Sequence, residues 1–181
     1  MTAFSRRHDS AFTLIELLIA FAMISIALAI GIPSAHHLSG SSRVSATAND
    51  LVHHLHYARS EAIRLVTSVV ICPSRDGSGC DDVNEWHRGF MLFADSNQNR
   101  VRDQGELLLK FKRPEHKGVR VWSSIRRKKL IYRATGMAPG STATITVCDR
   151  HGYAAPAAVI ISNPGRPRLS RTRADGSALQ C

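Results

Sequence analysis

The segment that decides the fold is Phe12-Thr-Leu-Ile-Glu-Leu-Leu-Ile-Ala-Phe-Ala-Met-Ile-Ser-Ile-Ala-Leu-Ala-Ile-Gly-Ile32. It has 21 residues and one charged side chain, Glu16. A helix rises about 1.5 Å per residue, so the segment is long enough to cross a bilayer core of about 30 Å. Arg6 and Arg7 precede it, and basic residues keep their flank of a span in the cytoplasm. The sequence therefore predicts a membrane-spanning helix, with the rest of the chain outside the cytoplasm.

Two simpler interpretations of this segment fit less well. A cleaved secretory signal has an apolar region of about 7–15 residues that ends at a small-x-small site. The present run is longer and continues into a helical pattern. A plain anchor gains nothing from a carboxylate such as Glu16, which is costly in an apolar phase. The presence of Glu16 therefore indicates that the helix has a function besides anchoring the chain.

A second helical pattern follows. Gly31 and Pro33 lie between the apolar segment and this second pattern. Proline removes a backbone donor and clashes with the preceding helical turn, so we expect a kink or local melt there. Apolar residues then recur at spacings of three and four: Val44, Ala48, Leu51, Leu55, Ala58, Ala62 and Leu65. This stripe predicts a helix that packs on a globular domain. We interpret its histidines as solvated, because no acidic or Cys partner has ligand spacing: His36, His37, His53, His54 and His56.

After about Val66 the apolar period changes to two. Short, often β-branched segments alternate with Gly, Pro, Asn and Asp clusters, which is typical of strands and turns. The predicted strands are 68–72, 85–93, 107–112, 119–123, 130–133, 142–148 and 157–162. The expected fold class is α+β, a long N-terminal helix packed on an antiparallel β-sheet or small β-sandwich.

The four cysteines are Cys72, Cys80, Cys148 and Cys181. An even number in an exported chain predicts two disulfides, with three possible connectivities. We favour the local pair Cys72–Cys80, which closes a Ser/Gly/Asp loop. That choice leaves Cys148 with Cys181 and would attach the C-terminal tail to a strand.

Residues 95–106 nearly match a twelve-residue calcium loop, with oxygen donors at positions one, three, five, nine and twelve. Arg100 occupies the position where the sharp turn requires Gly, and Arg102 adds positive charge. The flanking segments are predicted strands. We therefore favour a hairpin turn in which Asp and Asn side chains bond their own backbone, with calcium as the alternative.

Catalytic motifs do not appear. There is no Gly-x-Ser-x-Gly elbow, no phosphate-binding Gly loop and no carboxylate pair in an apolar setting. We therefore expect a protein that is not an enzyme, with no catalytic residues, no cofactor and no bound metal.

Positive charge is abundant and uneven. The formal net charge is +10, and an excess of this size favours polyanionic partners. Ten Lys and Arg lie between Lys110 and Arg133 against one acid, Glu115. Such a run is often just a solvated face, but Lys and Arg at this density can also bind DNA phosphates without reading sequence.

A sharper signal lies near the C-terminus, in Asn163-Pro-Gly-Arg-Pro-Arg168. Gly165 allows a positive φ, and Pro167 stiffens the loop without removing a donor that is needed. Arg166 and Arg168 would then display two guanidiniums close together, which suits bidentate phosphate contacts. Further basic residues in this region are Arg171 and Arg173.

The run Ala11-Phe-Thr-Leu-Ile-Glu-Leu17 resembles the type IV prepilin signature. The resemblance implies that a prepilin peptidase cleaves between Ala11 and Phe12 and methylates the Phe12 amine. It also implies that Glu16 neutralises the Phe12 amine of a neighbouring subunit during assembly. The family usually has Gly where this chain has Ala11.

Over nearly its whole length the chain resembles the FimT/GspH-type minor pilins and pseudopilins. The resemblance rests on the pilin helix, then Trp86-x-x-Gly89-Phe90 and Phe93-x-Asp95-x-Asn97, then a late strand entering Gly165-Arg-Pro-Arg168. It implies a pilin fold: a leader at 1–11, a membrane or filament-core helix at 12–41 and a periplasmic domain at 42–181.

Some members of the FimT branch bind DNA through a Gly-Arg-x-Arg loop and serve natural transformation. Carried over, this implies that Arg166 and Arg168 are the principal contacts with double-stranded DNA and that Gly165 shapes the loop. We add Arg171, Arg173, Lys128 and Lys129 as supporting charges. The implied partners are DNA, other major and minor pilins, prepilin peptidase and the inner membrane before assembly into a surface pilus. The alternatives are a type II secretion pseudopilin and a minor pilin that only primes assembly.

Overall fold

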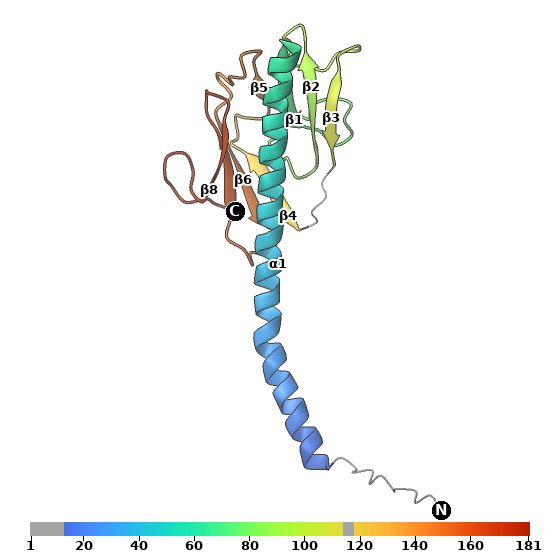
Figure 1. Ribbon diagram of the computed structural model, residues 1–181, viewed down its shortest axis with the longest axis vertical. Helices are drawn as coiled ribbons and strands as arrows, with labels where there is room; N and C mark the ends of the chain where they lie inside the picture. Colours follow the sequence, from blue (N-terminus) through green and yellow to red (C-terminus); the bar gives the residue numbers. More distant parts are fainter. Residues whose placement is uncertain (1–12, 114–117) are drawn as a thin grey trace, which may run out of the picture. The chain divides into compact units, whose positions relative to one another are not determined.

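The computed structural model describes residues 13–113 and 118–181. These contain one helix, α1 (Leu14–Leu65), and eight strands (Figure 1). The strands are β1 (Ser68–Pro73), β2 (Phe90–Asp95), β3 (Leu108–Lys112), β4 (Val119–Ser123), β5 (Leu130–Tyr132), β6 (Ala143–Asp149), β7 (Ala157–Ile161) and β8 (Pro167–Ser170). The chain divides into two compact units, residues 1–37 and 38–181, and the boundary falls inside α1.

The first unit consists, in its described part, of the apolar half of α1. The side chains from Leu14 to Ser39 are exposed, and α1 is the one helix among the described residues that is long and apolar enough to cross a membrane. The helix continues through Pro33, so the expected local melt is wrong. A proline removes a single amide donor, and the Ser34 hydroxyl donates to the Ile30 carbonyl at 3.2 Å within the same turn.

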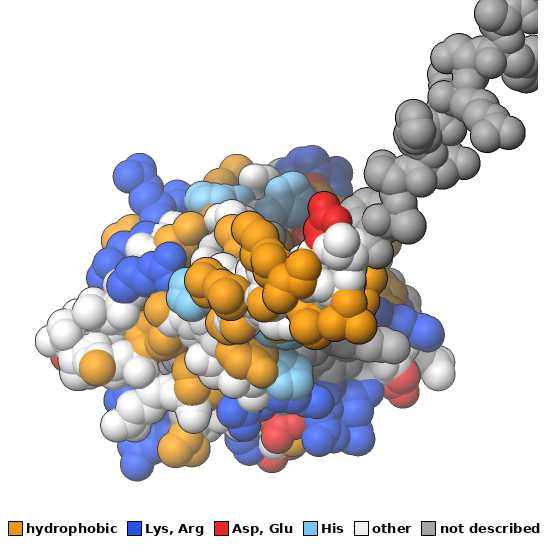
Figure 2. Space-filling view, turned by 90° about the horizontal axis from the view of Figure 1, so that it is seen from below, with side chains coloured by type: hydrophobic (Ala, Val, Ile, Leu, Met, Phe, Trp, Pro, Cys, Tyr) orange, Lys and Arg blue, Asp and Glu red, His pale blue; other side chains and the backbone are white. Residues whose placement is uncertain are grey.

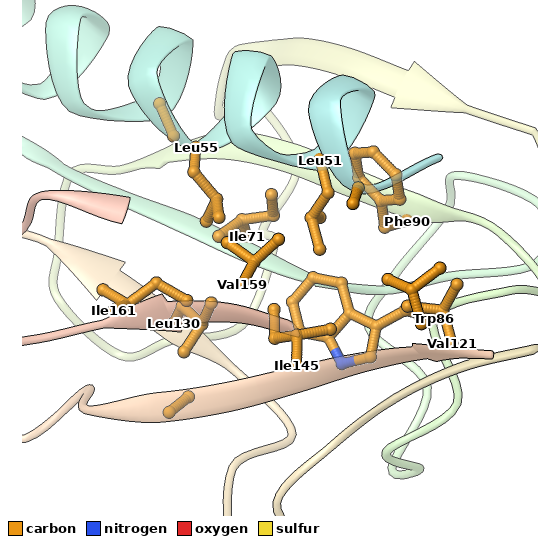
Figure 3. Close-up of a cluster of buried hydrophobic side chains, with 14 of the residues drawn as sticks. Leu51, Leu55, Ile71, Trp86, Phe90, Val121, Leu130, Ile145, Val159 and Ile161 are labelled. Atoms are coloured by element: carbon orange, nitrogen blue, oxygen red, sulfur yellow. The ribbon is translucent and has the colours of Figure 1, made fainter. Parts of the chain in front are cut away.

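The second unit consists of two antiparallel four-stranded sheets and the second half of α1. The strand orders are β3-β2-β1-β5 and β4-β6-β7-β8. Buried residues of α1, including Leu51 and Leu55, point toward Ile71 of one sheet and Val159 of the other (Figure 3). The predicted stripe from Val44 to Ala62 is buried in this core, because its spacing places these side chains on one face of the helix.

A smaller apolar cluster lies on the other face of the first sheet. It contains Val70, Cys72, Met91 and Phe93, and partly buried residues such as Phe111 pack against it. The loop closed by the Cys72–Cys80 disulfide covers this cluster. A Cβ on Gly77 would lie 2.8 Å from the Phe111 ring, so the loop sits directly on that ring.

Two local predictions differ from the structure. The predicted strand 85–93 begins only at Phe90, because Gly89 turns the backbone with φ +122° and a Cβ there would lie 2.5 Å from the Ser74 carbonyl oxygen. Trp86, just before that turn, is buried in the core. His54 is buried and not solvated, with Nδ1 2.8 Å from the Asp50 carbonyl oxygen and its ring edge-on to Phe90.

Candidate nucleic-acid interface

The Gly165-Arg-Pro-Arg168 segment is the turn of a β-hairpin and the start of its second strand. β7 pairs with β8, with Ile161 opposite Pro167 and Ile160 opposite Arg168. The Gly165 amide donates to the Ser162 carbonyl at 2.8 Å and closes the turn. The loop predicted for 163–168 is confirmed for residues 163–166, whereas Pro167 and Arg168 belong to β8, a strand at the edge of its sheet. Figure 1 shows β8 beside the other strands of this sheet.

Strand β8 was not predicted from the sequence, and Pro167 is the main reason. Proline has no amide to donate, so it is accepted in a sheet only at an edge or at the first position of a strand. Pro167 is both: it is the first residue of β8, and β8 is an edge strand. A strand of four residues that begins with proline is too short to show the alternation of apolar and polar residues from which strands are predicted.

Gly165 is held against a neighbouring turn. Its φ is +75°, and a Cβ there would lie 2.3 Å from the Gly136 carbonyl oxygen and 3.1 Å from the Tyr132 ring. The Ala138 amide donates to the Asn163 carbonyl at 2.9 Å, which joins the two turns directly. Tyr132 is fully buried beneath them, and this burial raises the pKa of its hydroxyl. The hairpin turn is therefore packed closely against the turn at Gly136 and the Tyr132 ring.

Arg166 and Arg168 point away from that base. Gly165 and Pro167 are buried, whereas Arg166 and Arg168 are exposed, so side chains alternate between the two faces. Within residues 13–113 and 118–181, neither guanidinium makes a hydrogen bond or an ion pair. Both arginines that the sequence singled out are thus exposed to solvent, two positions apart along the chain.

The four supporting charges do not join this pair as one cluster. Lys128 Nζ lies 2.8 Å from Asp82 Oδ2, and Lys129 Nζ donates to the Arg100 carbonyl at 2.7 Å. Arg171 Nη1 donates to the Pro156 carbonyl at 3.3 Å, at the other end of β7. Arg173 lies in the tail beyond β8 and lines a groove with Arg126 and Arg127.

The basic run from Lys110 to Arg133 is dispersed in the folded unit. It supplies β3 and β5, which are opposite edges of one sheet, and β4, which belongs to the other sheet. Lys112 also pairs with Asp50, and Arg133 donates to the Gln98 side chain at 2.8 Å. Seen from below, Lys and Arg side chains stand in several separate groups around the unit (Figure 2). The run is therefore not one continuous DNA-binding patch.

Residues 95–106 form a hairpin turn in which acidic side chains accept hydrogen bonds from backbone amides of the same turn. This is the interpretation that we favoured from the sequence. Asp95 Oδ2 accepts from the Arg100 amide at 3.1 Å, and Glu106 Oε1 accepts from the Ser96 amide at 2.8 Å. Asp103 Oδ2 accepts from Asn97 and Asn99 at 2.8 and 2.6 Å. Burial raises the pKa of Asp95, against the pull of the backbone donors. Several of the oxygens proposed for calcium, among them Asp95 Oδ2, are thus hydrogen-bonded within the loop.

The predicted processing site, Ala11 and Phe12, lies outside the described residues. Glu16 is described and lies exposed in the first turn of α1. The Glu16 amide donates to the Thr13 hydroxyl at 3.3 Å, so Thr13 caps the helix. A negative charge in the first turn also stabilises a helix through its interaction with the helix dipole. Glu16 can therefore stabilise α1 locally, in addition to its predicted role in assembly.

The disulfides join Cys72 to Cys80 and Cys148 to Cys181, with Cα–Cα distances of 5.6 and 5.8 Å. This is the pairing favoured from the sequence. The second bridge attaches the C-terminal residue to the end of β6, and with it the segment that carries Arg173.

Comparison with solved structures places the fold in a known class. Two crystal structures of the type IV minor pilin FimU from Pseudomonas aeruginosa PAO1, in different space groups, are similar to this chain. The first has a TM-score of 0.55 at 20% identity and covers 71% of this chain and 89% of the FimU chain. The second has a TM-score of 0.52 at 20% identity, with coverages of 70% and 91%. The fold is therefore the pilin fold.

Sequence comparison identifies the family. Residues 47–165 match the family described as Type II transport protein GspH, and residues 6–32 match the prokaryotic N-terminal methylation motif. The first match covers more than half of the chain, so the chain belongs to the GspH family, as a minor pilin or pseudopilin. No curated protein sequence matches the chain. The methylation motif and the apolar helix fit a membrane-anchored pilin that is later assembled into a filament.

Proposed function

We propose that this chain is a minor type IV pilin that binds extracellular double-stranded DNA without sequence preference and serves DNA uptake. The observation that supports the proposal is the β7–β8 hairpin, with Arg166 and Arg168 exposed and free of internal partners. Because the backbone of this turn is already ordered, binding of phosphate by the two guanidiniums needs no further ordering of the backbone. Contacts with phosphate carry no sequence information, so such a site accepts any duplex.

The proposed cellular course follows from the N-terminal segment. After cleavage between Ala11 and Phe12 and methylation of the Phe12 amine, the apolar half of α1 would span the inner membrane and the globular unit would lie in the periplasm. Glu16 would then pair with that amine of a neighbouring subunit when the chain enters a pilus. The opposite charges, brought together in an apolar filament core, would favour one axial position of the helix.

DNA binding can be measured directly on the full chain in neutral detergent. We expect a labelled duplex of either of two unrelated sequences to bind with a dissociation constant of about 10⁻⁶–10⁻⁴ M, weakening as salt rises. Arg166→Ala/Arg168→Ala should weaken binding by about tenfold or more, since each lost charged contact contributes over about 1 kcal/mol. Fluorescence anisotropy over a salt series measures both quantities.

The matched control is Arg113→Ala/Arg150→Ala, which removes the same number of charges from exposed positions outside the hairpin. Arg150 lies in the β6–β7 turn, at the opposite end of β7 from Arg166. The control should retain most of the affinity. Equal losses in the two double variants would refute a specific role for the hairpin and leave only the effect of net charge.

A second candidate function is a pseudopilin of a type II secretion system, and the description of the matched family favours it. This role needs contacts with other pseudopilins and no DNA. Deletion of the gene in the source bacterium separates the two functions. Loss of DNA uptake with normal secretion supports the first, and loss of secretion with normal uptake supports the second.

A further inference from the structure

The outer face of the β4-β6-β7-β8 sheet extends from the hairpin to a second group of arginines. Pairing aligns Thr144, Ile160 and Arg168 across three strands, and aligns Trp122, Thr146, Ala158 and Ser170 in the next row. Side chains in register on neighbouring strands share a face, so Arg168 and Trp122 are on the same side of the sheet. Ile145, Val147 and Val159 occupy the other side, in the core.

A groove of about 640 Å³ lies on this outer face. Its floor includes Trp122, Thr144 and Thr146, and its walls carry Arg126, Arg127 and Arg173. Arg120 adds a guanidinium 5.9 Å from the centre of the Trp122 ring. One carboxylate, Asp175, also lines the groove, but its Oδ1 accepts from the amide and hydroxyl of Ser177 and so closes the turn of the tail.

One wall of the groove is the turn at residues 124–127, directly after β4, and hydrogen bonds fix its conformation. The Arg127 amide donates to the Ser124 carbonyl at 2.7 Å, and the Ser124 amide donates to the Thr144 carbonyl at 3.1 Å. The Ser123 hydroxyl donates to the Arg127 carbonyl, and Arg127 Nη1 donates to the Gly140 carbonyl at 2.6 Å. Arg126, at the tip of this turn, is exposed.

The opposite wall is the C-terminal tail. The Arg173 amide donates to the Ser177 carbonyl at 2.9 Å, and Thr172 forms a bridge with Ala178. The Cys148–Cys181 disulfide attaches the end of this small hairpin to β6. Arg126 and Arg173, one on each wall, make no side-chain hydrogen bond or ion pair within the part of the chain that is described. Their donors face the groove or solvent on a surface whose backbone is already ordered.

We propose that this groove is a second phosphate-binding site for the same DNA duplex, with Arg126 and Arg173 as its contacts. The proposal rests on the proposed DNA-binding function and adds the path of the duplex over the molecule. β4 and β8 are three strand spacings apart, or about 14 Å. That distance spans about four nucleotides of one strand of a duplex, at about 3.4 Å each. One duplex can therefore contact the hairpin and the groove together.

The number of phosphates contacted is measured by the salt dependence of binding. Each lost phosphate contact lowers the slope of log affinity against log salt by about 0.9. For the full chain in neutral detergent, Arg126→Ala/Arg173→Ala should lower that slope by about 1.8 with a labelled duplex of about 30 base pairs. Arg126→Glu alone leaves the tail intact and should also lower the slope. Arg113→Ala/Arg150→Ala should leave it unchanged.

The outcomes separate the groove from the hairpin. If Arg166→Ala/Arg168→Ala weakens binding as predicted but both groove variants keep the wild-type slope, the groove proposal is wrong and the hairpin proposal stands. If the wild-type chain binds no duplex, the proposed function itself is wrong, and the groove proposal falls with it. A reduced slope in both groove variants, with intact disulfides by non-reducing mass spectrometry, supports the second site.

Discussion

At the scale of single residues, glycine decides where the arginines of the candidate interface point. Gly165 combines a positive φ with a close approach to the Gly136 carbonyl oxygen, and either condition alone disfavours another residue. Moving the backbone at Gly165 would move Arg166 as well. The sequence could suggest the positive φ but not the close approach, because Gly136 is distant along the chain.

Substitution at Gly165 separates these two conditions. Gly152 has φ +76° and no atom within 4 Å of an added Cβ, so Gly152→Ala tests the backbone conformation alone. We expect Gly152→Ala to lower the free energy of unfolding by about 1–2 kcal/mol. Gly165→Ala should lower it further and weaken DNA binding. Chemical unfolding followed by the fluorescence of buried Trp86 measures the difference, and equal losses would contradict the close approach.

At the scale of elements, a buried carboxylate connects α1 to the β6–β7 turn. Asp149 Oδ1 lies 3.3 Å from Arg43 Nη2, and its Oδ2 accepts from the Tyr153 amide at 2.9 Å. Burial opposes ionisation of Asp149, but the hydrogen bond from the Tyr153 amide and the charge of Arg43 outweigh this effect and hold the pKa of Asp149 below its ordinary value. A lowered pKa in the folded state contributes stability above the unfolded pKa, and this contribution is lost as pH falls through the folded value.

Asp149→Asn should therefore destabilise the globular unit in a pH-dependent way. At pH 7 we expect a loss of about 1–3 kcal/mol, the usual effect of leaving a buried partner unsatisfied. The difference from wild type should shrink as the pH falls below about 4, because the Asp149 carboxylate of the unfolded chain then takes up a proton more readily than the folded one. Unfolding curves at pH 7 and pH 3 measure this difference. A difference that is constant with pH would contradict an ionised Asp149.

At the scale of the whole molecule, the chain joins two surfaces of opposite character. Residues 14–32 expose mostly apolar side chains, which fits a membrane-anchored pilin. Residues 38–181 form a unit with its own core and a basic surface. The pilin fold thus supplies the attachment, and the sheet face with Arg168 supplies the proposed contact with DNA.

Glu16→Ala tests the attachment. The apolar segment remains long enough to span a bilayer, so we expect normal membrane insertion. Without its carboxylate the subunit should fail to enter filaments, because the Phe12 amine of a neighbour would lack its partner. Membrane fractionation and immunodetection in sheared pili measure the two steps. Glu16→Asp, which keeps the charge, is the control, and normal incorporation of Glu16→Ala would rule out the pairing.

The sequence alone was sufficient for features that depend on neighbours along the chain. The apolar run with Glu16, the buried stripe of α1 and the approximate positions of seven strands follow from local periodicity. Arg166 and Arg168, separated by one residue, could also be identified from the sequence alone. Strand order, register and loop contacts depend on residues far apart, so only the tertiary structure decided them. It made Pro167–Ser170 an edge strand, placed Gly136 beneath Gly165, dispersed the basic run and formed the groove between Arg126 and Arg173.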